Sequence, residues 1–103
     1  MNRGEIWWLE HPDAGRRPAC ILTRQAAIAV LYAVLVAPAT RTVRGIPTEV
    51  TLDQRDGFEA VCAINCDELV TIDKSRLERR RGALSTARLS ELDDALRFAL
   101  QLR

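Results

Sequence analysis

Short apolar runs separated by polar turns make up most of the chain. The apolar runs lie at residues 5–9, 18–23, 48–52 and 60–65, and two shorter ones follow at 70–72 and 81–84, on either side of a polar turn at 73–75. Runs of this length, rich in Val, Ile and Thr and bounded by Gly, Pro, Asn and Asp, are typical of β-strands. With the segment discussed next, the pattern predicts six or seven short strands.

Residues 26–37 form the longest apolar stretch, which is compatible with a helix or a strand. The β-branched residues Val30, Val34 and Val36 favour a buried strand in its later half. Pro18 donates no ladder hydrogen bond, so we expect it at the beginning or at an edge of its strand. The segments 11–15 and 53–57 are rich in turn formers and are predicted to connect strands.

The hydrophobic period changes near the end of the chain. Leu89, Leu92, Leu96 and Ala99 are spaced as an apolar stripe on a helix, and Ser85 or Thr86 stands where an N-cap is expected. Several short strands without alternating helices predict a small, curled, mainly antiparallel sheet, covered on one open side by this amphipathic helix. The length, 103 residues with 48% apolar residues, fits one domain spanning 1–103.

Positive charge is concentrated in one half of the chain. Although the net charge is only +1, residues 14–48 contain no acid and five arginines: Arg16, Arg17, Arg24, Arg41 and Arg44. This half is therefore expected to carry positive potential. The basic segments 15–18 and 37–47 lie in predicted loops, where binding groups concentrate but where solvated arginines are equally common. Composition alone leaves both readings open.

Several function classes are disfavoured by residue content. A single histidine, His11, argues against a Ser/His/Asp hydrolase. Cys20, Cys62 and Cys66 lack the usual zinc spacing and are expected to be free, buried thiols, so we predict neither a metal nor a cofactor. No run approaches the roughly 20 apolar residues of a spanning helix, and Glu5 is acidic too early for a signal peptide. We therefore expect a cytoplasmic protein with no membrane partner.

Four blocks in order along the chain carry a recognisable pattern. They read Gly-Glu-Ile-Trp-Trp at 4–8, Gly-Arg-Arg-Pro at 15–18, Val-Ala-Pro-Ala-Thr-Arg-Thr at 36–42 with Arg-Gly-Ile-Pro-Thr-Glu-Val at 44–50, and Cys-Asp-Glu-Leu-Val-Thr-Ile at 66–72. In these blocks the chain resembles the MazF/PemK family of toxins. The resemblance implies an SH3-like barrel of the CcdB/PemK type with a C-terminal helix, assembled as a two-fold homodimer.

The same resemblance implies a function. Family members are mRNA interferases of type II toxin-antitoxin systems, which cut single-stranded RNA without a metal and leave a 2′,3′-cyclic phosphate and a 5′-hydroxyl. Such a toxin inhibits translation and growth, and a MazE-like antitoxin with a disordered acidic tail holds it silent. Single-stranded RNA suits this chemistry because the 2′-hydroxyl must line up with the leaving oxygen.

Carried over residue by residue, the resemblance makes Arg17, Thr40 and Asp67 the catalytic residues. Arg17 would stabilise the phosphorane, Thr40 would donate a hydrogen bond to the same phosphoryl group, and Asp67 or His11 would be the base. RNA contacts are expected from Arg16, Arg41, Thr42, Arg44 and Asn65.

Two other functions stay open at this point. A CcdB-like toxin, which binds a topoisomerase, shares the fold, but Arg17 and Thr40 with their motifs belong to the nuclease branch. A non-catalytic RNA-binding barrel is the second alternative, because Asn65 stands where PemK-like members have arginine. For the tandem Trp7 and Trp8 we expect one side chain in the core and one at the surface or dimer interface. Residues 79–81, three arginines, are predicted to form a solvated strand edge.

Overall fold

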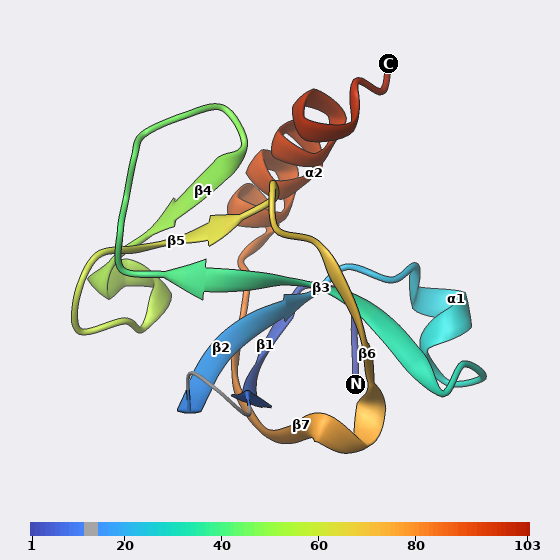
Figure 1. Cartoon of the computed structure of the whole chain (residues 1–103). Helices are drawn as coiled ribbons and strands as arrows, with labels where there is room; N and C mark the ends of the chain where they lie inside the picture. The colour runs from blue at the N-terminus through green and yellow to red at the C-terminus, as the bar shows by residue number, and fades with distance from the viewer. Residues whose placement is uncertain (12–14) are drawn as a thin grey trace.

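The computed structural model describes residues 1–11 and 15–103, which form a curled antiparallel sheet with one long helix against it (Figure 1). Residues 12–14 of the predicted turn at 11–15 and the His11 side chain lie outside the described part. The elements in chain order are β1 (Glu5–His11), β2 (Gly15–Ile21), α1 (Gln25–Ile28), β3 (Ala33–Thr40), β4 (Glu49–Leu52), η1 (Gln54–Asp56), β5 (Cys62–Asn65), β6 (Val70–Asp73), η2 (Lys74–Arg76), β7 (Leu77–Ala83) and α2 (Thr86–Leu100).

Strand β3 is the centre of the sheet. The strand order is β4-β5-β3-β2-β1-β7, and β6 pairs with β3 off this path. The first half of β3 pairs with β6, whereas its last two residues, Ala39 and Thr40, pair with β5. Because the two halves of β3 have different neighbours, the sheet curls around this strand. The prediction of a mainly antiparallel, curled sheet is confirmed.

Two apolar clusters fill opposite faces of β2 and β3. Cys20 and Ala37 belong to the cluster that includes Leu92 of α2, whereas Ile21 and Val36 belong to a second cluster with strands β6 and β7. Strands buried on both faces have continuous apolar runs instead of alternating ones. This explains why residues 26–37 were compatible with a helix: only Gln25–Ile28 is helical, and β3 occupies the later half, as predicted.

Helix α2 has the predicted cap and stripe. The Ser85 hydroxyl accepts a hydrogen bond from the Arg88 backbone N–H at 3.2 Å, an N-cap that typically contributes about 1 kcal/mol. Leu92 and Ala95 are buried, with Leu89 and Leu96 packed partly against the same cluster. Within the described residues, no helix has the length and apolar character needed to cross a membrane.

Two strand boundaries differ from the sequence prediction. Strand β7 begins at Leu77 and not at residue 81, because its first half is an exposed, charged edge without an apolar signature. Strand β2 begins at Gly15, three residues before Pro18. Pairing of β2 with β3 covers only residues 19–21, so at Pro18 the strand has β1 as its neighbour. Pro18 therefore stands at a local edge, where its missing N–H leaves no ladder partner unsatisfied.

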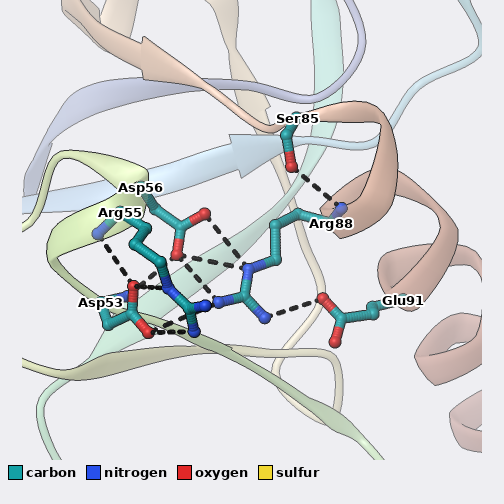
Figure 2. A network of polar contacts seen from close by, with 6 residues as sticks. All are labelled: Asp53, Arg55, Asp56, Ser85, Arg88 and Glu91. Carbon is teal, nitrogen blue, oxygen red and sulfur yellow. Dashed lines mark hydrogen bonds and ion pairs between the residues drawn. The ribbon is translucent and has the colours of Figure 1, made fainter.

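Arg88 ties the η1 segment to helix α2 (Figure 2). Its Nε and Nη2 atoms donate to the Asp56 carboxylate, each at 3.1 Å to the nearest oxygen, and its Nη1 donates to Glu91 at 2.9 Å. Asp53 caps the N-terminus of η1: its backbone N–H donates to the Asp56 carboxylate at 2.9 Å, and its own carboxylate accepts from the Arg55 N–H at 2.9 Å. Since the Arg88 and Asp56 side chains are only 18% and 10% exposed, this contact fixes the path of the chain from β4 toward β5.

Candidate active site

Arg17 and Thr40 lie together between two depressions on the surface of the described residues. Both residues line both depressions, although they come from different strands, β2 and β3. The large depression, about 760 Å³, is lined by Trp8, Arg16, Arg17, Pro18, Ala39, Thr40, Arg41, Phe58, Glu59, Ala60, Cys62 and Arg81. The small depression, about 150 Å³, is lined by Arg17, Thr40, Thr42, Arg44, Asn65 and Glu68.

The backbone of β3 positions the Arg17 guanidinium. Its Nη2 atom donates to the carbonyl oxygen of Ala39 at 3.3 Å, and Ala39 directly precedes Thr40. The Thr40 Oγ1 atom accepts a hydrogen bond from the Thr42 N–H at 3.1 Å. Because that contact uses an oxygen lone pair, the hydroxyl proton of Thr40 is left to donate toward an anionic ligand.

Glu49 shapes the basic loop between β3 and β4. Its Oε1 atom accepts hydrogen bonds from the backbone N–H groups of Arg44 at 2.9 Å and Gly45 at 3.1 Å. Gly45 has a φ of +67°, a conformation that residues with side chains rarely adopt. The Arg-Gly-Ile-Pro-Thr-Glu block thus specifies a closed loop. It presents Arg41 at the large depression and Thr42 and Arg44 at the small one.

The two predicted site residues at the end of β5, Asn65 and Asp67, have side chains in different surroundings. Asn65 is buried and lines the small depression, where its Oδ1 atom accepts from the Asp67 N–H at 2.9 Å. Asp67 is exposed, and its Oδ2 atom accepts from the Thr48 hydroxyl at 2.6 Å. Asp67 lines neither depression. Among the described residues that line the small depression, the carboxylate is that of Glu68. In the sequence, Glu68 is marked only by its adjacency to Asp67 and was not predicted as a site residue.

The two tryptophans point to different environments, as expected for neighbours on a strand. Trp7 packs against the second apolar cluster, and its indole N–H donates to the Glu5 carboxylate at 3.1 Å. Trp8 lines the large depression. Burial raises the pKa of Glu5, but hydrogen bonds from Asn2 and Trp7 and the charge of Arg80 outweigh it, so the pKa lies below its usual value.

The arginine run 79–81 is only in part the solvated edge that was predicted. Arg79 is exposed. Arg80 is exposed as well, and it forms an ion pair with buried Glu5 at 3.0 Å. The prediction is wrong for Arg81, which is half-buried and lies over the Phe58 ring with its guanidinium carbon 4.2 Å from the ring centre. Arg16, predicted to contact RNA, lines the large depression and pairs with Glu78 at 2.9 Å.

The three cysteines are free and buried, as predicted. Cys62 lines the large depression, but burial raises the pKa of its thiol, with the Arg81 charge acting in the opposite direction. Burial likewise raises the pKa of Cys20 to about 12 and that of Cys66 to about 11. All three are therefore thiols at neutral pH and poor nucleophiles. The site offers guanidinium, hydroxyl and amide donors, which suit a phosphodiester.

Comparison with known proteins identifies the family. Residues 2–100 match the family of PemK-like, MazF-like toxins of type II toxin-antitoxin systems. The chain belongs to this family. It is similar to the probable endoribonuclease MazF5 of Mycobacterium tuberculosis, with 39% identity over 99 residues that cover 95% of this chain and 91% of the relative.

Solved structures of MazF toxins share the fold. The Mycobacterium tuberculosis toxin MazF-mt6 superposes with a TM-score of 0.88 at 34% identity, covering 96% of this chain and 98% of that one. A mycobacterial endoribonuclease in complex with its cognate antitoxin gives a TM-score of 0.89 at 26% identity, covering 100% and 97%. The predicted SH3-like barrel of the CcdB/PemK type with a C-terminal helix is confirmed. Membership of the PemK/MazF family, more than the fold, separates this chain from a CcdB-like topoisomerase-binding toxin.

Proposed function

We propose that this chain is the toxin of a type II toxin-antitoxin pair and acts in the cytoplasm as a metal-independent endoribonuclease on single-stranded RNA. The observation that carries the proposal is the convergence of Arg17 and Thr40 between two depressions lined with arginines, in a chain of the MazF/PemK family. Relatives of this chain are named endoribonucleases.

The proposed reaction is self-cleavage of RNA. The 2′-oxygen attacks the adjacent phosphorus, its proton passes to a base, and the bond from phosphorus to the 5′-oxygen breaks as that oxygen takes up a proton. The products are a 2′,3′-cyclic phosphate and a 5′-hydroxyl. Arg17 stabilises the charge of the phosphorane with its planar donors, and Thr40 donates its hydroxyl proton to a phosphoryl oxygen. The substrate supplies its own nucleophile, so protonated Cys62 has no role in the attack.

Asn65 and two carboxylates complete the proposed centre. Because the Asn65 Oδ1 atom accepts from the Asp67 N–H, its amide N–H₂ is oriented away from that contact and serves as a donor to phosphate. Asp67 is the proposed base. Glu68 is a second candidate, favoured by its position on the small depression with Arg17 and Thr40.

Arg16, Arg41, Thr42 and Arg44 are the proposed contacts to the RNA backbone. The three arginines are exposed and line the depressions on either side of Arg17. Each phosphate contact adds to the salt dependence of binding, because counterions are released from the RNA. RNA affinity should therefore fall as salt rises.

The proposed partners are a second copy of the chain and a MazE-like antitoxin. One structural neighbour was solved with its cognate antitoxin, and we infer the same kind of partner here. A disordered acidic tail that folds on binding can compete with RNA for Arg17, Arg41 and Arg44. A two-fold homodimer would present two such surfaces symmetrically.

A cleavage assay with mapped product ends tests the proposal. Purified protein is incubated with a long RNA, with and without chelator, and 5′-hydroxyl ends are mapped. We expect discrete cuts that chelator leaves unchanged and that Arg17→Ala reduces by roughly 100-fold or more. Arg24→Ala is the matched control, since Arg24 is exposed and lies outside both depressions. RNA that is bound but left intact would instead identify a non-catalytic RNA-binding barrel, the alternative suggested by Asn65.

A further inference from the structure

Strand β7 contains two extra residues opposite β1. In the described register, Arg81 and Glu78 have no partner of their own in β1, because the pairing shifts twice. Such β-bulges interrupt the alternation of side chains and often redirect them near functional sites. The pairs on either side of the shifts are Ile6 with Gly82, Trp7 with Arg80, Trp8 with Arg79 and Leu9 with Leu77.

Both extra residues help to place a guanidinium beside the Trp8 ring. Glu78 holds the Arg16 guanidinium by an ion pair of 2.9 Å, and that guanidinium lies 5.6 Å from the centre of the Trp8 ring. The Arg81 guanidinium lies 5.9 Å from the same ring centre. The half-buried indole therefore has two planar cations beside it, and all three side chains line the large depression.

Arg81 is held in place before any ligand arrives. Its guanidinium lies over buried Phe58, and its Nη2 atom donates to the Gly57 carbonyl oxygen at 2.9 Å. The η1 segment, which Gly57 caps, is itself tied to α2 through Arg88 and Asp56. A preorganised arginine has already lost its rotamer freedom on folding, so ligand binding does not need to order it. Its remaining N–H donors are available to a ligand.

We propose that Trp8, Arg16 and Arg81 form a nucleotide subsite beside the Arg17–Thr40 centre, in the same large depression. A nucleobase adjacent to the scissile phosphate stacks on the Trp8 indole, and the two guanidiniums contact that nucleotide's base edge or phosphate. Indole and guanidinium planes both stack on bases, and such stacking tolerates any base because each has a π-face. The subsite rests on the proposed function, since it positions RNA whose phosphate reaches Arg17.

Tryptophan fluorescence tests the subsite directly. In a Trp7→Phe background, Trp8 is the sole tryptophan, and the probe is a mixed-sequence hexamer of 2′-O-methyl RNA, which has no free 2′-hydroxyl and is not cleaved. We expect saturable quenching of Trp8. Arg81→Gln and Phe58→Leu should weaken binding by about 5- to 100-fold, the range that loss of one stacked base implies. A poly-glutamate peptide that quenches Trp8 when the RNA hexamer does not would overturn the proposal in favour of an acidic protein ligand.

Arg79→Gln provides the matched control. It removes the same charge from the same strand, but Arg79 is exposed and lies outside both depressions. We expect its affinity for the hexamer to stay within twofold of the parent, a margin of a few tenths of a kcal/mol. Equal weakening by Arg79→Gln and Arg81→Gln would overturn the subsite, because it would reduce the effect to net charge. Phe58→Leu keeps the net charge of the protein and a buried apolar side chain at position 58. Circular dichroism verifies that Arg81→Gln and Phe58→Leu both fold.

Cleavage kinetics separate failure of the subsite from failure of the proposed function. If the subsite positions RNA, Arg81→Gln raises KM for a long RNA and leaves the cut sites in place. A wild-type protein that cuts RNA, with Arg81→Gln showing an unchanged KM and Trp8 left unquenched, refutes the subsite and leaves the nuclease intact. A wild-type protein that never cuts RNA, but whose Trp8 is quenched by the hexamer, refutes the nuclease and supports the subsite.

Discussion

The Arg17 guanidinium donates to the carbonyl oxygen of Ala39 at 3.3 Å, although the two residues are 22 positions apart in the chain. Pairing of β2 with β3 brings them together, with Ala19 opposite Pro38. The next residue after Ala39 is Thr40, so this hydrogen bond to the β3 backbone holds the Arg17 guanidinium near Thr40. The donor orientation of Arg17 therefore depends on the backbone of β3.

Replacing Arg17 by lysine tests whether shape or charge matters. Lysine keeps the positive charge but loses the planar fork that can bind the Ala39 carbonyl and a phosphoryl group together. We expect Arg17→Lys to lose roughly 100-fold in kcat, nearly as much as the loss of one preorganised donor, with an unchanged melting temperature. Single-turnover cleavage gives the rate, and thermal unfolding gives the control. Near wild-type cleavage by Arg17→Lys would show that a point charge is sufficient.

Thr40 should act through its hydroxyl. Thr40→Val keeps the branched shape but removes both the proposed phosphoryl donor and the acceptor for the Thr42 N–H. We expect Thr40→Val to lower kcat by about 10- to 100-fold, somewhat less than a full oxyanion-hole donor, and Thr40→Ser to recover part of the rate. The two variants are compared under saturating RNA. Equal activity of the serine and valine variants would assign Thr40 a packing role.

The pH dependence of cleavage decides between the two carboxylates. If Asp67 accepts the 2′ proton, Asp67→Asn lowers kcat and removes the acidic limb of the pH–rate profile, because the base that protonates at low pH is gone. Glu68→Gln is the parallel variant, and on the Asp67 hypothesis it retains that limb. Profiles are measured for both under single-turnover conditions. The reverse result would transfer the role to Glu68, which lines the small depression.

Glu49 should affect activity through the loop that it closes. Glu49→Ala removes the acceptor of the Arg44 and Gly45 backbone N–H groups, and each unpaired donor destabilises the closed loop by about 1 kcal/mol. We expect weaker RNA binding, and Glu49→Gln should restore part of it because the amide oxygen still accepts. Hydrogen exchange of residues 44 and 45 reports the loop itself. Unchanged exchange in Glu49→Ala would show that the loop is held by other contacts.

The contact between Arg88 and Asp56 should stabilise the fold without entering the reaction. Hydrogen bonds to charged groups contribute about 1.5–3 kcal/mol when they are shielded from solvent, and these side chains are 18% and 10% exposed. We expect Arg88→Met and Asp56→Asn each to lower the free energy of unfolding by about 2 kcal/mol. A double-mutant cycle in urea isolates the pair, and additive losses would show that the two side chains are not coupled.

Local patterns in the sequence were sufficient for most of the elements. The period of Leu89, Leu92 and Leu96 and the cap at Ser85 specified α2, since a helix is defined by contacts within three or four residues. The same holds for Glu49, whose bonds to Arg44 and Gly45 lie within its own sequence block. These blocks were also the basis for the family resemblance, and with it for Arg17 and Thr40.

The arrangement around the site depended on pairing between distant strands. Nothing local distinguishes Arg81 from Arg79, because the bulge that directs Arg81 toward Trp8 and Phe58 exists only in the register of β7 with β1. The same applies to Glu68 and Asp67: they are neighbours in sequence, but the chain reversal after β5 puts Glu68 on the small depression and leaves Asp67 bonded to Thr48. The sequence by itself determined the elements, the family blocks and most of the candidate residues, because these depend on side-chain type and local spacing. Only the tertiary structure decided which of them share a surface, because strand register and bulges are set by partners far away in the chain.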